Sequence, residues 1–163
     1  PPEQVRTITT LNQDSFALRV NQVLPNESEN IKAGVVFLAR QEQNFQGFNH
    51  NYYGVMADIG PWTGGDRYFN GSFPSTEGSA GQGKRTSRIR YFASFNSDED
   101  SIQFIAQQLK RKGWQNVTED TIASTYYKTW LSPEDPDKLI KKDEGKKAQL
   151  WASVINSIRS NLS

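Results

Sequence analysis

The sequence predicts a single, mainly α-helical domain of the α+β class that carries a small β-hairpin lobe. Apolar residues recur at helical spacing in several separate stretches of the chain, which is the pattern of amphipathic helices. Between these stretches, one segment is rich in Gly, Ser, Asn and aromatic residues, as turns and short strands are. The length of 163 residues is that of about one domain and allows a sizeable core.

The chain begins with a polar, Thr-rich stretch. We expect residues 1–14 to form an N-terminal arm or linker and residues 15–163 to form the domain. Because the chain opens with Pro1-Pro2 and has no initiator Met, we also expect it to be processed, or to be part of a larger modular protein or assembly.

Two helices are predicted in the first part of the domain. Helical periodicity starts at Phe16, and Pro25 ends it. A second helix is predicted over residues 31–42, because this apolar run follows the polar residues 26–29, which are suited to cap the first amide groups of a helix. Glu42 is then the last residue of this helix.

Residues 44–88 are predicted to form loops and the β-hairpin lobe. Asn70-Gly71 lies between short aromatic runs, which is a signal for a hairpin turn. The segment ends in residues 88–93, whose composition is that of a strand.

Helical patterns return in the second half of the chain. The acidic residues 98–100 are suited to a helix N-terminus, and we expect the helix that follows them to stop at Gly113. A further helix is predicted over about residues 119–131. The last helix is predicted over residues 146–158, whose apolar stripe is most simply part of the core.

Composition excludes several functions. Nineteen basic and 18 acidic residues leave a net charge of +1, which gives little long-range attraction to nucleic acid or to an anionic membrane. No apolar run approaches the roughly 20 residues that span a bilayer. The absence of Cys excludes disulfides and thiolate metal sites and leaves the compartment open. His50 is the only histidine, so a histidine zinc cluster is excluded, and we expect His50 to support a loop through a hydrogen bond.

Residues 78–84 match the spacing of a phosphate-binding loop as far as its lysine. The next position holds Arg85 where that loop needs a Ser or Thr hydroxyl, and the flanking sequence has neither the strand pattern nor the helix pattern of such a loop. We therefore interpret residues 78–84 as the tip of a hairpin, and nucleotide binding is the least favoured function.

Glu42 is the main candidate for a catalytic residue. The negative end of the helix macrodipole and the neighbouring Phe37, Phe45 and Phe48 would disfavour its ionised form. We therefore expect a raised pKa, as a general acid requires. The alternative is that Glu42 is a solvated residue at the end of a core helix.

Aromatic residues are dense in the Gly-rich segment, where a core would more often use aliphatic residues. Carbohydrate-binding grooves combine such rings with Asn, Asp and backbone groups, because ring faces pack on sugar C–H groups while polar groups bind hydroxyls. The alternative is that part of these rings fix long loops to the helical body. The residues concerned are Tyr52, Tyr53, Trp62, Tyr68, Phe69 and Phe73.

Three segments resemble the bacterial peptidoglycan glucosaminidases of the flagellar and autolysin type, within the lysozyme-like superfamily. The first is the helix end at residues 39–42. The second is Asn-Tyr-Tyr-Gly-Val-Met-Ala at residues 51–57 with Trp-Thr-Gly at 62–64, which is similar to the family's Asn-Leu-Phe-Gly-Ile-Lys-Ala and Trp-x-Gly. The third is residues 89–95, which are similar to its Phe-Arg-x-Tyr-x-Ser and lead into Asp-Ser at 100–101.

The resemblance implies a lysozyme-like fold in which a glycan binds between the helical domain and the hairpin lobe. It implies Glu42 as the general acid and Glu77 as the second carboxylate, for which Asp58 and Asp66 are further candidates. It also implies a Tyr on a late helix that supports the substrate, for which core packing is the alternative. The residues that it assigns to glycan binding are Asn51, Tyr52, Tyr53, Asp58, Trp62, Tyr126 and Tyr127.

From this resemblance we expect an enzyme that cleaves β-1,4 bonds of peptidoglycan, first of all an endo-β-N-acetylglucosaminidase, which needs no metal or other cofactor. Its partner would be the glycan strand, in the bacterial cell envelope, after secretion or in a phage particle. A lytic transglycosylase or muramidase using Glu42 alone is an alternative. So is a non-catalytic peptidoglycan-binding wall module, since Gln43 and Met56 replace the family's Ser and Lys.

Overall fold

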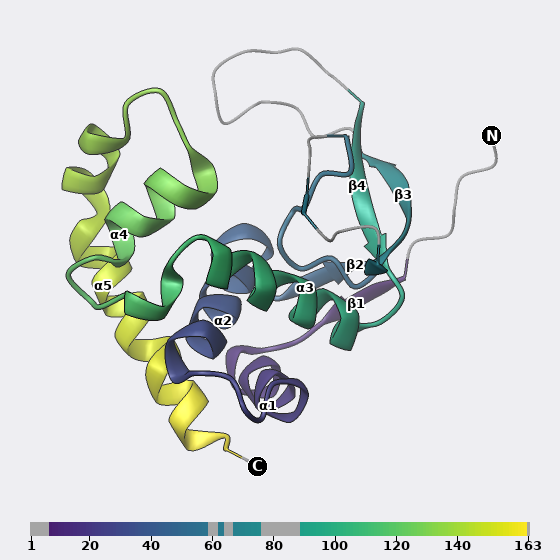
Figure 1. Cartoon of the computed structure of the whole chain (residues 1–163), viewed down its shortest axis with the longest axis horizontal. Coiled ribbons are helices and arrows are strands. Elements are labelled where there is room, and N and C mark those ends of the chain that lie inside the picture. The colour runs from purple at the N-terminus through teal and green to yellow at the C-terminus, as the bar shows by residue number, and fades with distance from the viewer. Residues whose placement is uncertain (1–6, 59–61, 64–66, 76–88, 163) are drawn as a thin grey trace.

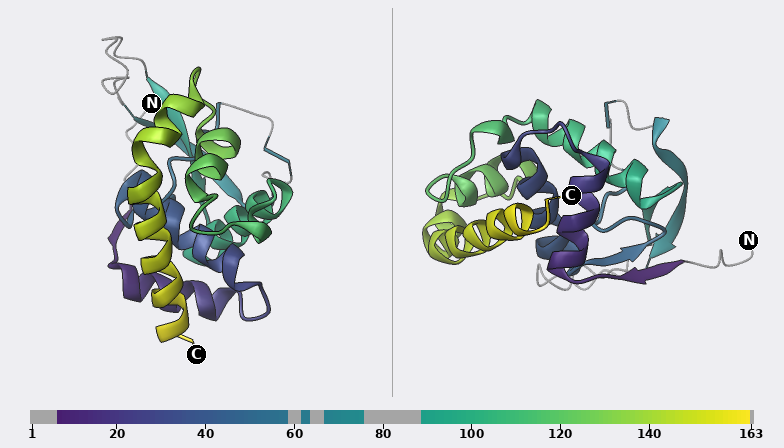
Figure 2. Two further views of the ribbon diagram at one scale, coloured as in Figure 1. Left: turned by 90° about the vertical axis from the view of Figure 1, so that its left-hand side faces the viewer. Right: turned by 90° about the horizontal axis from the view of Figure 1, so that it is seen from below.

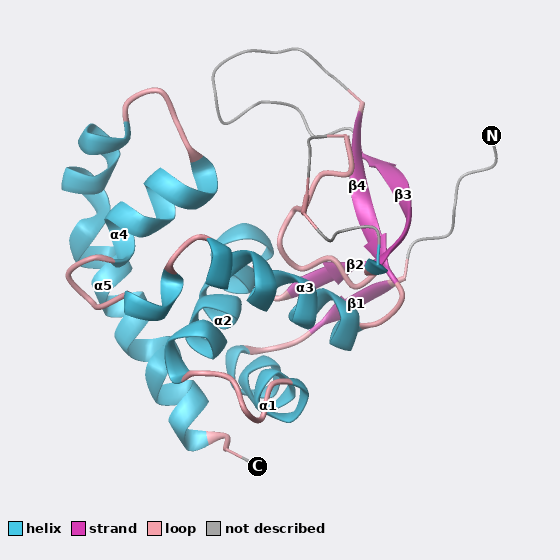
Figure 3. Cartoon of the chain, viewed as in Figure 1, coloured by secondary structure: helices cyan, strands magenta, loops and turns pink. Residues whose placement is uncertain are grey.

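The computed structural model describes residues 7–58, 62–63, 67–75 and 89–162. Glu77, Asp66 and the segment 78–84 lie outside these residues, so the structure says nothing of the roles predicted for them. Within the described part, the helices form a body to which two small antiparallel sheets attach at one side (Figures 1 and 3). This confirms the predicted fold class, mainly helical with a small β-hairpin lobe.

The elements follow one another in a mostly helical order. They are β1 (Ile8–Thr10), α1 (Gln13–Val23), α2 (Glu29–Gln43), β2 (Gln46–Phe48), β3 (Phe69–Ser75), β4 (Arg90–Phe95), α3 (Asp98–Arg111), the 3-10 helix η3 (Trp114–Asn116), α4 (Ile122–Thr125), the π-helix η4 (Tyr126–Leu131) and α5 (Pro136–Ser160). None of the helices described is both long and apolar enough to cross a membrane.

The centre of the helical body is α2. Every residue from Ile31 to Ala39 is buried, because α1, α3 and α5 pack around this helix. Ser28 caps its first turn by accepting a hydrogen bond from the amide of Ile31, which agrees with the capping role predicted for residues 26–29. Figure 2 shows α5 as the long helix that runs along one side of this body.

Two strand pairs connect the loops to the body. β1 pairs antiparallel with β2, and β3 pairs antiparallel with β4. Residues 8–10 of the predicted N-terminal arm are therefore extended but hydrogen-bonded to the domain, and α1 already begins at Gln13. The predicted division after residue 14 itself stays a prediction.

The prediction of a hairpin turn at Asn70-Gly71 is wrong. Both residues lie inside β3, where Gly71 has a φ of 74° and the register with β4 shifts between Phe69 and Ser72. The pair forms a β-bulge, because the left-handed conformation that suits Asn-Gly to a turn also suits it to a bulge. The strand predicted over residues 88–93 is found slightly later, as β4.

The late helices also differ from their predicted bounds. α5 begins at Pro136 rather than at residue 146, because Asp135 caps it through the amide of Lys138 while Pro136 takes its first turn. Its first turns are too polar to show an apolar stripe. The helix predicted over residues 119–131 is α4 followed by η4, so the hydrogen-bond pattern changes from α to π within it.

Aromatic contacts around Phe37, near the middle of α2, hold the body together. Phe37 has its ring centroid 6.2 Å from that of Trp114, 5.5 Å from that of Tyr126 and 6.0 Å from that of Trp151. Edge-to-face contacts of this kind stabilise each pair by about 1 kcal/mol beyond the area that they bury. Phe37 therefore joins the middle of α2 to η3, η4 and α5.

Replacement of two glycines by alanine should change the free energy of unfolding in opposite directions. A Cβ added to Gly47 would lie 2.5 Å from the buried ring of Tyr52, so Gly47→Ala should lower the free energy of unfolding by about 2 kcal/mol. Gly145 lies inside α5 with no atom within 4 Å of an added Cβ, so Gly145→Ala should raise it by about 0.5 to 1 kcal/mol. Urea unfolding of both variants measures these changes, and an unchanged Gly47→Ala variant would contradict the close packing of Tyr52.

Candidate functional site

Glu42 lies in the last turn of α2 with its side chain partly exposed. The helix ends in two left-handed residues, Asn44 (φ 48°) and Phe45 (φ 63°), whose amides bond to carbonyls of the last turn. Glu42 Oε1 accepts a hydrogen bond of 2.8 Å from the hydroxyl of Tyr126, which is 84 residues away in the sequence. The structure thus brings together two of the predicted site residues.

Tyr126 belongs to the core through its ring and contacts Glu42 through its hydroxyl. Its ring is buried and packs on Phe37, while its hydroxyl reaches the carboxylate of Glu42. Burial, and then the negative charge of Glu42, raise the pKa of Tyr126 well above its usual value. The hydroxyl therefore keeps its proton at physiological pH and donates it to the hydrogen bond with Glu42.

A second tyrosine and two charged residues of α5 adjoin this pair. The ring centroid of Tyr127 lies 5.2 Å from that of Tyr126, and its hydroxyl donates a hydrogen bond of 2.5 Å to Asp143. Burial, and then this hydrogen bond, raise the pKa of Tyr127 to about 12, while the same bond lowers the pKa of Asp143. Lys147 places Nζ 5.5 Å from the centre of the Tyr126 ring and 5.8 Å from that of the Tyr127 ring.

Neither Asp143 nor Lys147 was a candidate from the sequence. Asp143 lies in the part of α5 whose polar composition hides the helix. The signal that points to them is their spacing, since an acidic residue four positions before a basic one places both on one helical face.

Two tryptophans, Trp62 and Trp130 of η4, form a further aromatic contact. The rings of Trp62 and Trp130 have centroids 6.1 Å apart and planes at 46°. Trp62 is fixed by a hydrogen bond of 2.8 Å from Nε1 to the carbonyl of Met56, and Lys112 Nζ lies 5.9 Å from the centre of the Trp130 ring. Both rings are half-buried, so part of each faces solvent. Trp130 was missed in the sequence, although it follows Tyr126 by four residues on one predicted helix.

A pocket of about 70 Å³ lies where the end of α2 meets the β-hairpin lobe. Gln43, the neighbour of Glu42, lines it from the helical body, and Ser75 and Phe92 line it from the lobe. The pocket is also lined by Phe48, Asn51, Gly54 and Phe73. It lies at the junction where the resemblance expects the glycan.

The structure places two predicted groove residues in the core instead. Tyr52 and Tyr53 are 0% and 2% exposed and pack against Phe16 of α1, so neither ring offers a face to a ligand. Asn51 borders the pocket, but its amide bonds to the protein itself. Its Nδ2 donates to the carbonyls of Val55 and Ala93, and its Oδ1 accepts from two backbone amides.

The other aromatic candidates of this segment also pack on rings of the protein. Tyr68 and Phe69 pack on Phe104 of α3, which agrees with the alternative that part of these rings fix loops to the helical body, whereas Phe73 packs within the hairpin lobe. Tyr68 and Phe73 are buried, and the ring of Phe73 stacks on that of Phe92 with centroids 5.8 Å apart. The ring of Phe69 packs on that of Phe95, with centroids 5.3 Å apart. Asp58, by contrast, is exposed in a turn.

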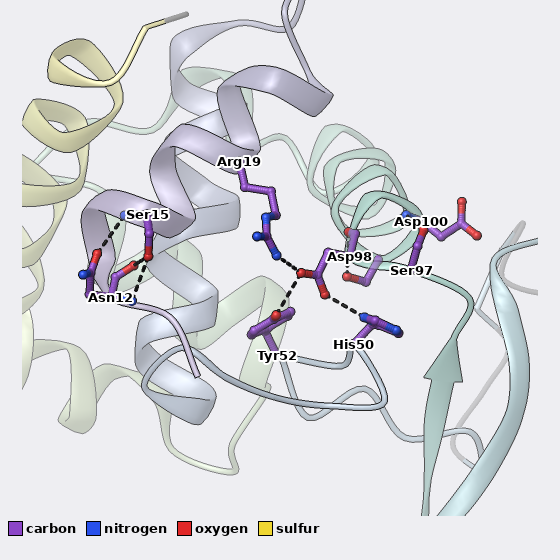
Figure 4. Close-up of polar contacts among 9 residues, drawn as sticks. Asn12, Ser15, Arg19, His50, Tyr52, Ser97, Asp98 and Asp100 are labelled. Carbon is purple, nitrogen blue, oxygen red and sulfur yellow. Dashed lines mark hydrogen bonds and ion pairs between the residues drawn. The ribbon is translucent and has the colours of Figure 1, made fainter. Parts of the chain in front are cut away.

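Figure 4 shows a second polar cluster, centred on Asp98 in the first turn of α3. The carboxylate accepts hydrogen bonds from Arg19 of α1 and, at 3.0 Å, from the hydroxyl of Tyr52, and it lies 2.8 Å from His50 Nδ1. This confirms the loop-supporting hydrogen bond predicted for His50. Asn49 and His50, in the loop after β2, both have positive φ, of 50° and 64°. The cluster therefore holds a strained loop against α1 and α3.

Within the described ranges, no group of three His, Cys, Asp or Glu side chains could hold a metal ion. No protein-family model matches the sequence, and no curated protein or solved structure is significantly similar to it. The class of protein is therefore defined by fold and site alone. It is an α+β domain in which a carboxylate at the end of a buried helix contacts a buried tyrosine, and in which two half-buried tryptophans pack on each other.

Because the pKa of Tyr127 is raised in the folded protein, the free energy of unfolding should depend on pH in the alkaline range. Between pH 10 and about 12 the unfolded chain loses this proton while the folded protein keeps it, so rising pH favours unfolding in this interval. We expect Tyr127→Phe to lower stability below pH 10, where its hydrogen bond to Asp143 is lost, and to make the decline above pH 10 shallower. Urea unfolding at a series of pH values measures both effects, and equal slopes for variant and parent would contradict the expectation.

Proposed function

We propose that this protein is a glycoside hydrolase that cleaves β-1,4 bonds of peptidoglycan, with Glu42 as its general acid. The observation that carries the proposal is the 2.8 Å hydrogen bond from the buried Tyr126 to Glu42 at the end of the central helix. The resemblance to peptidoglycan glucosaminidases names this glutamate and expects a late-helix tyrosine near it. These two residues, distant in sequence, are in contact, which supports the resemblance.

The proposed chemistry uses the contact directly. Hydrolysis starts when a protonated carboxyl group donates its proton to the glycosidic oxygen and is left as a carboxylate. Tyr126 is held by Phe37, so its hydroxyl orients the side chain of Glu42. The same hydroxyl stabilises the carboxylate that forms after proton transfer, because it donates a hydrogen bond to it.

The second group is either Glu77, which would activate water in an inverting enzyme, or the N-acetyl group of the substrate itself. Ser75 at the end of β3 and Gln43 beside Glu42 line one pocket. Glu77 lies outside the described residues, so its role as the second carboxylate rests on the resemblance.

The tryptophan pair supports a glycan as the ligand. Trp62 and Trp130 are half-buried and fixed by the protein, and such rings bind the apolar faces of sugars at little cost in side-chain entropy. Trp130 shares η4 with Tyr126, so one short helix carries a ring of the proposed sugar platform and the tyrosine that contacts the proposed acid, Glu42. The proposed place of action is the bacterial cell envelope, the medium into which a cell secretes, or a phage particle.

Replacement of the acid tests the proposal. Glu42→Gln keeps the size of the side chain and an oxygen for Tyr126 but removes the donated proton, so we expect fragment release from purified peptidoglycan to fall about 10²- to 10⁴-fold. Glu99→Gln, at an exposed position in the first turn of α3, is the matched control and should release fragments like the parent.

Mass spectrometry of the released ends identifies the reaction. Reducing N-acetylglucosamine ends indicate the proposed glucosaminidase, reducing N-acetylmuramic acid ends a muramidase, and anhydro ends a lytic transglycosylase. If the parent protein binds peptidoglycan of several types but releases nothing from any of them, the enzyme proposal is refuted in favour of a binding module.

Replacement of a platform ring tests sugar binding separately from proton transfer. We expect Trp130→Ala to raise KM for soluble peptidoglycan fragments about tenfold with a smaller change in kcat, because it removes a stacking surface and leaves Glu42 and Tyr126 in place. Trp130→Phe should recover part of the affinity. An equal fall of kcat in both variants, with KM unchanged, would contradict a binding role.

A further inference from the structure

Lys147 is partly buried and lies in line with the buried stripe of α5. Trp151, Val154 and Ile158 form the buried stripe of α5, and Lys147 stands four residues before Trp151, on the same face. The stripe therefore directs Lys147 toward the body, where its ammonium lies over the rings of Tyr126 and Tyr127. Burial lowers the pKa of Lys147, because the charged form loses part of its solvation at this position.

Charged and titratable groups surround this ammonium from three elements. α5 contributes Asp143 and Lys146, η4 contributes the two tyrosines, and α2 contributes Glu42. The carboxylates of Asp143 and Glu42 attract Lys147, whereas Lys146 repels it. Each tyrosine hydroxyl bonds to one of these carboxylates, so Lys147 lies over a pair of rings whose hydroxyls hold two acids.

We infer that Lys147 is a positioning residue of the proposed active site, which holds the Tyr126–Tyr127 pair and sets the pH range in which Glu42 keeps the proton that it donates. The inference rests on the proposed function of Glu42. The end of α2 disfavours a carboxylate at Glu42 because the helix dipole is negative there. The ammonium of Lys147 favours the carboxylate. The hydrogen bond from Tyr126 also favours the carboxylate, so these three effects together determine at which pH the acid is available.

A purely structural lysine would behave differently. Its removal would change the stability of η4 and α5 without changing the titration of Glu42. The titration is therefore the readout that separates the two roles, and it requires no turnover.

The experiment is a carbon-13 NMR titration of the protein with labelled glutamate side chains, in which Glu42→Gln identifies the Glu42 signal. In Lys147→Met we expect the midpoint of Glu42 to rise by about 0.5 pH unit, because an attractive charge is lost. In Lys147→Arg the midpoint should stay near that of the parent. Lys141→Met, an equal charge change at an exposed position of α5, is the matched control and should also leave it in place.

The pH dependence of fragment release from peptidoglycan completes the test. Activity that needs protonated Glu42 falls at high pH, so this limb of the profile should move to higher pH in Lys147→Met and stay in place in Lys147→Arg. An unchanged Glu42 midpoint in folded Lys147→Met overturns the inference. If the midpoint moves but the parent protein releases no fragments, the coupling of Lys147 to Glu42 is supported and the proposed function fails. Should Lys147→Met not fold, Lys147→Gln gives the same loss of charge.

Discussion

The burial of α2 on all sides is the constraint on which the rest of the structure depends. A helix without a polar face between Ile31 and Ala39 is stable only when other elements cover it, so α1, α3 and α5 must surround it. Gly34 permits the close approach of α3, since a Cβ at this position would lie 2.8 Å from the side chain of Leu109. Polar chemistry is then left to the ends of α2, and Glu42 stands at one of them.

The position of the Glu42 contact follows from the same packing. Phe37, five residues before Glu42 on α2, packs against rings from η3, η4 and α5, and one of these rings belongs to Tyr126. The hydroxyl that meets Glu42 is therefore placed by the core rather than by a flexible surface chain. A site whose groups are held by packed side chains keeps its geometry during reaction, which is what electrostatic catalysis needs.

Local signals predicted much of the fold and one half of the site. Apolar periodicity predicted α1, and periodicity together with polar or acidic residues at the helix N-terminus predicted α2 and α3. The helix-end position of Glu42 could therefore be predicted from the sequence. The bulge at Gly71 could not be distinguished from a turn, because both use the same backbone conformation. The burial of Tyr52 under Phe16 could not be predicted from the many aromatic residues in its segment, since only the tertiary fold brings α1 over that loop.

The start of α5 shows why the remaining part of the site was hidden. Residues near Asp143 carry too many charges to display an apolar stripe, yet the helix continues through them because Trp151 and the residues after it anchor its far end in the core. One rigid helix thus carries both the anchor and, four residues before Trp151, a lysine at a core-facing position. A leucine there would bury more apolar surface without a desolvated charge. Lys147 thus interrupts the apolar stripe of α5 beside two tyrosines that donate hydrogen bonds to carboxylates. A functional reason is expected where a residue departs in this way from the pattern that stabilises the fold.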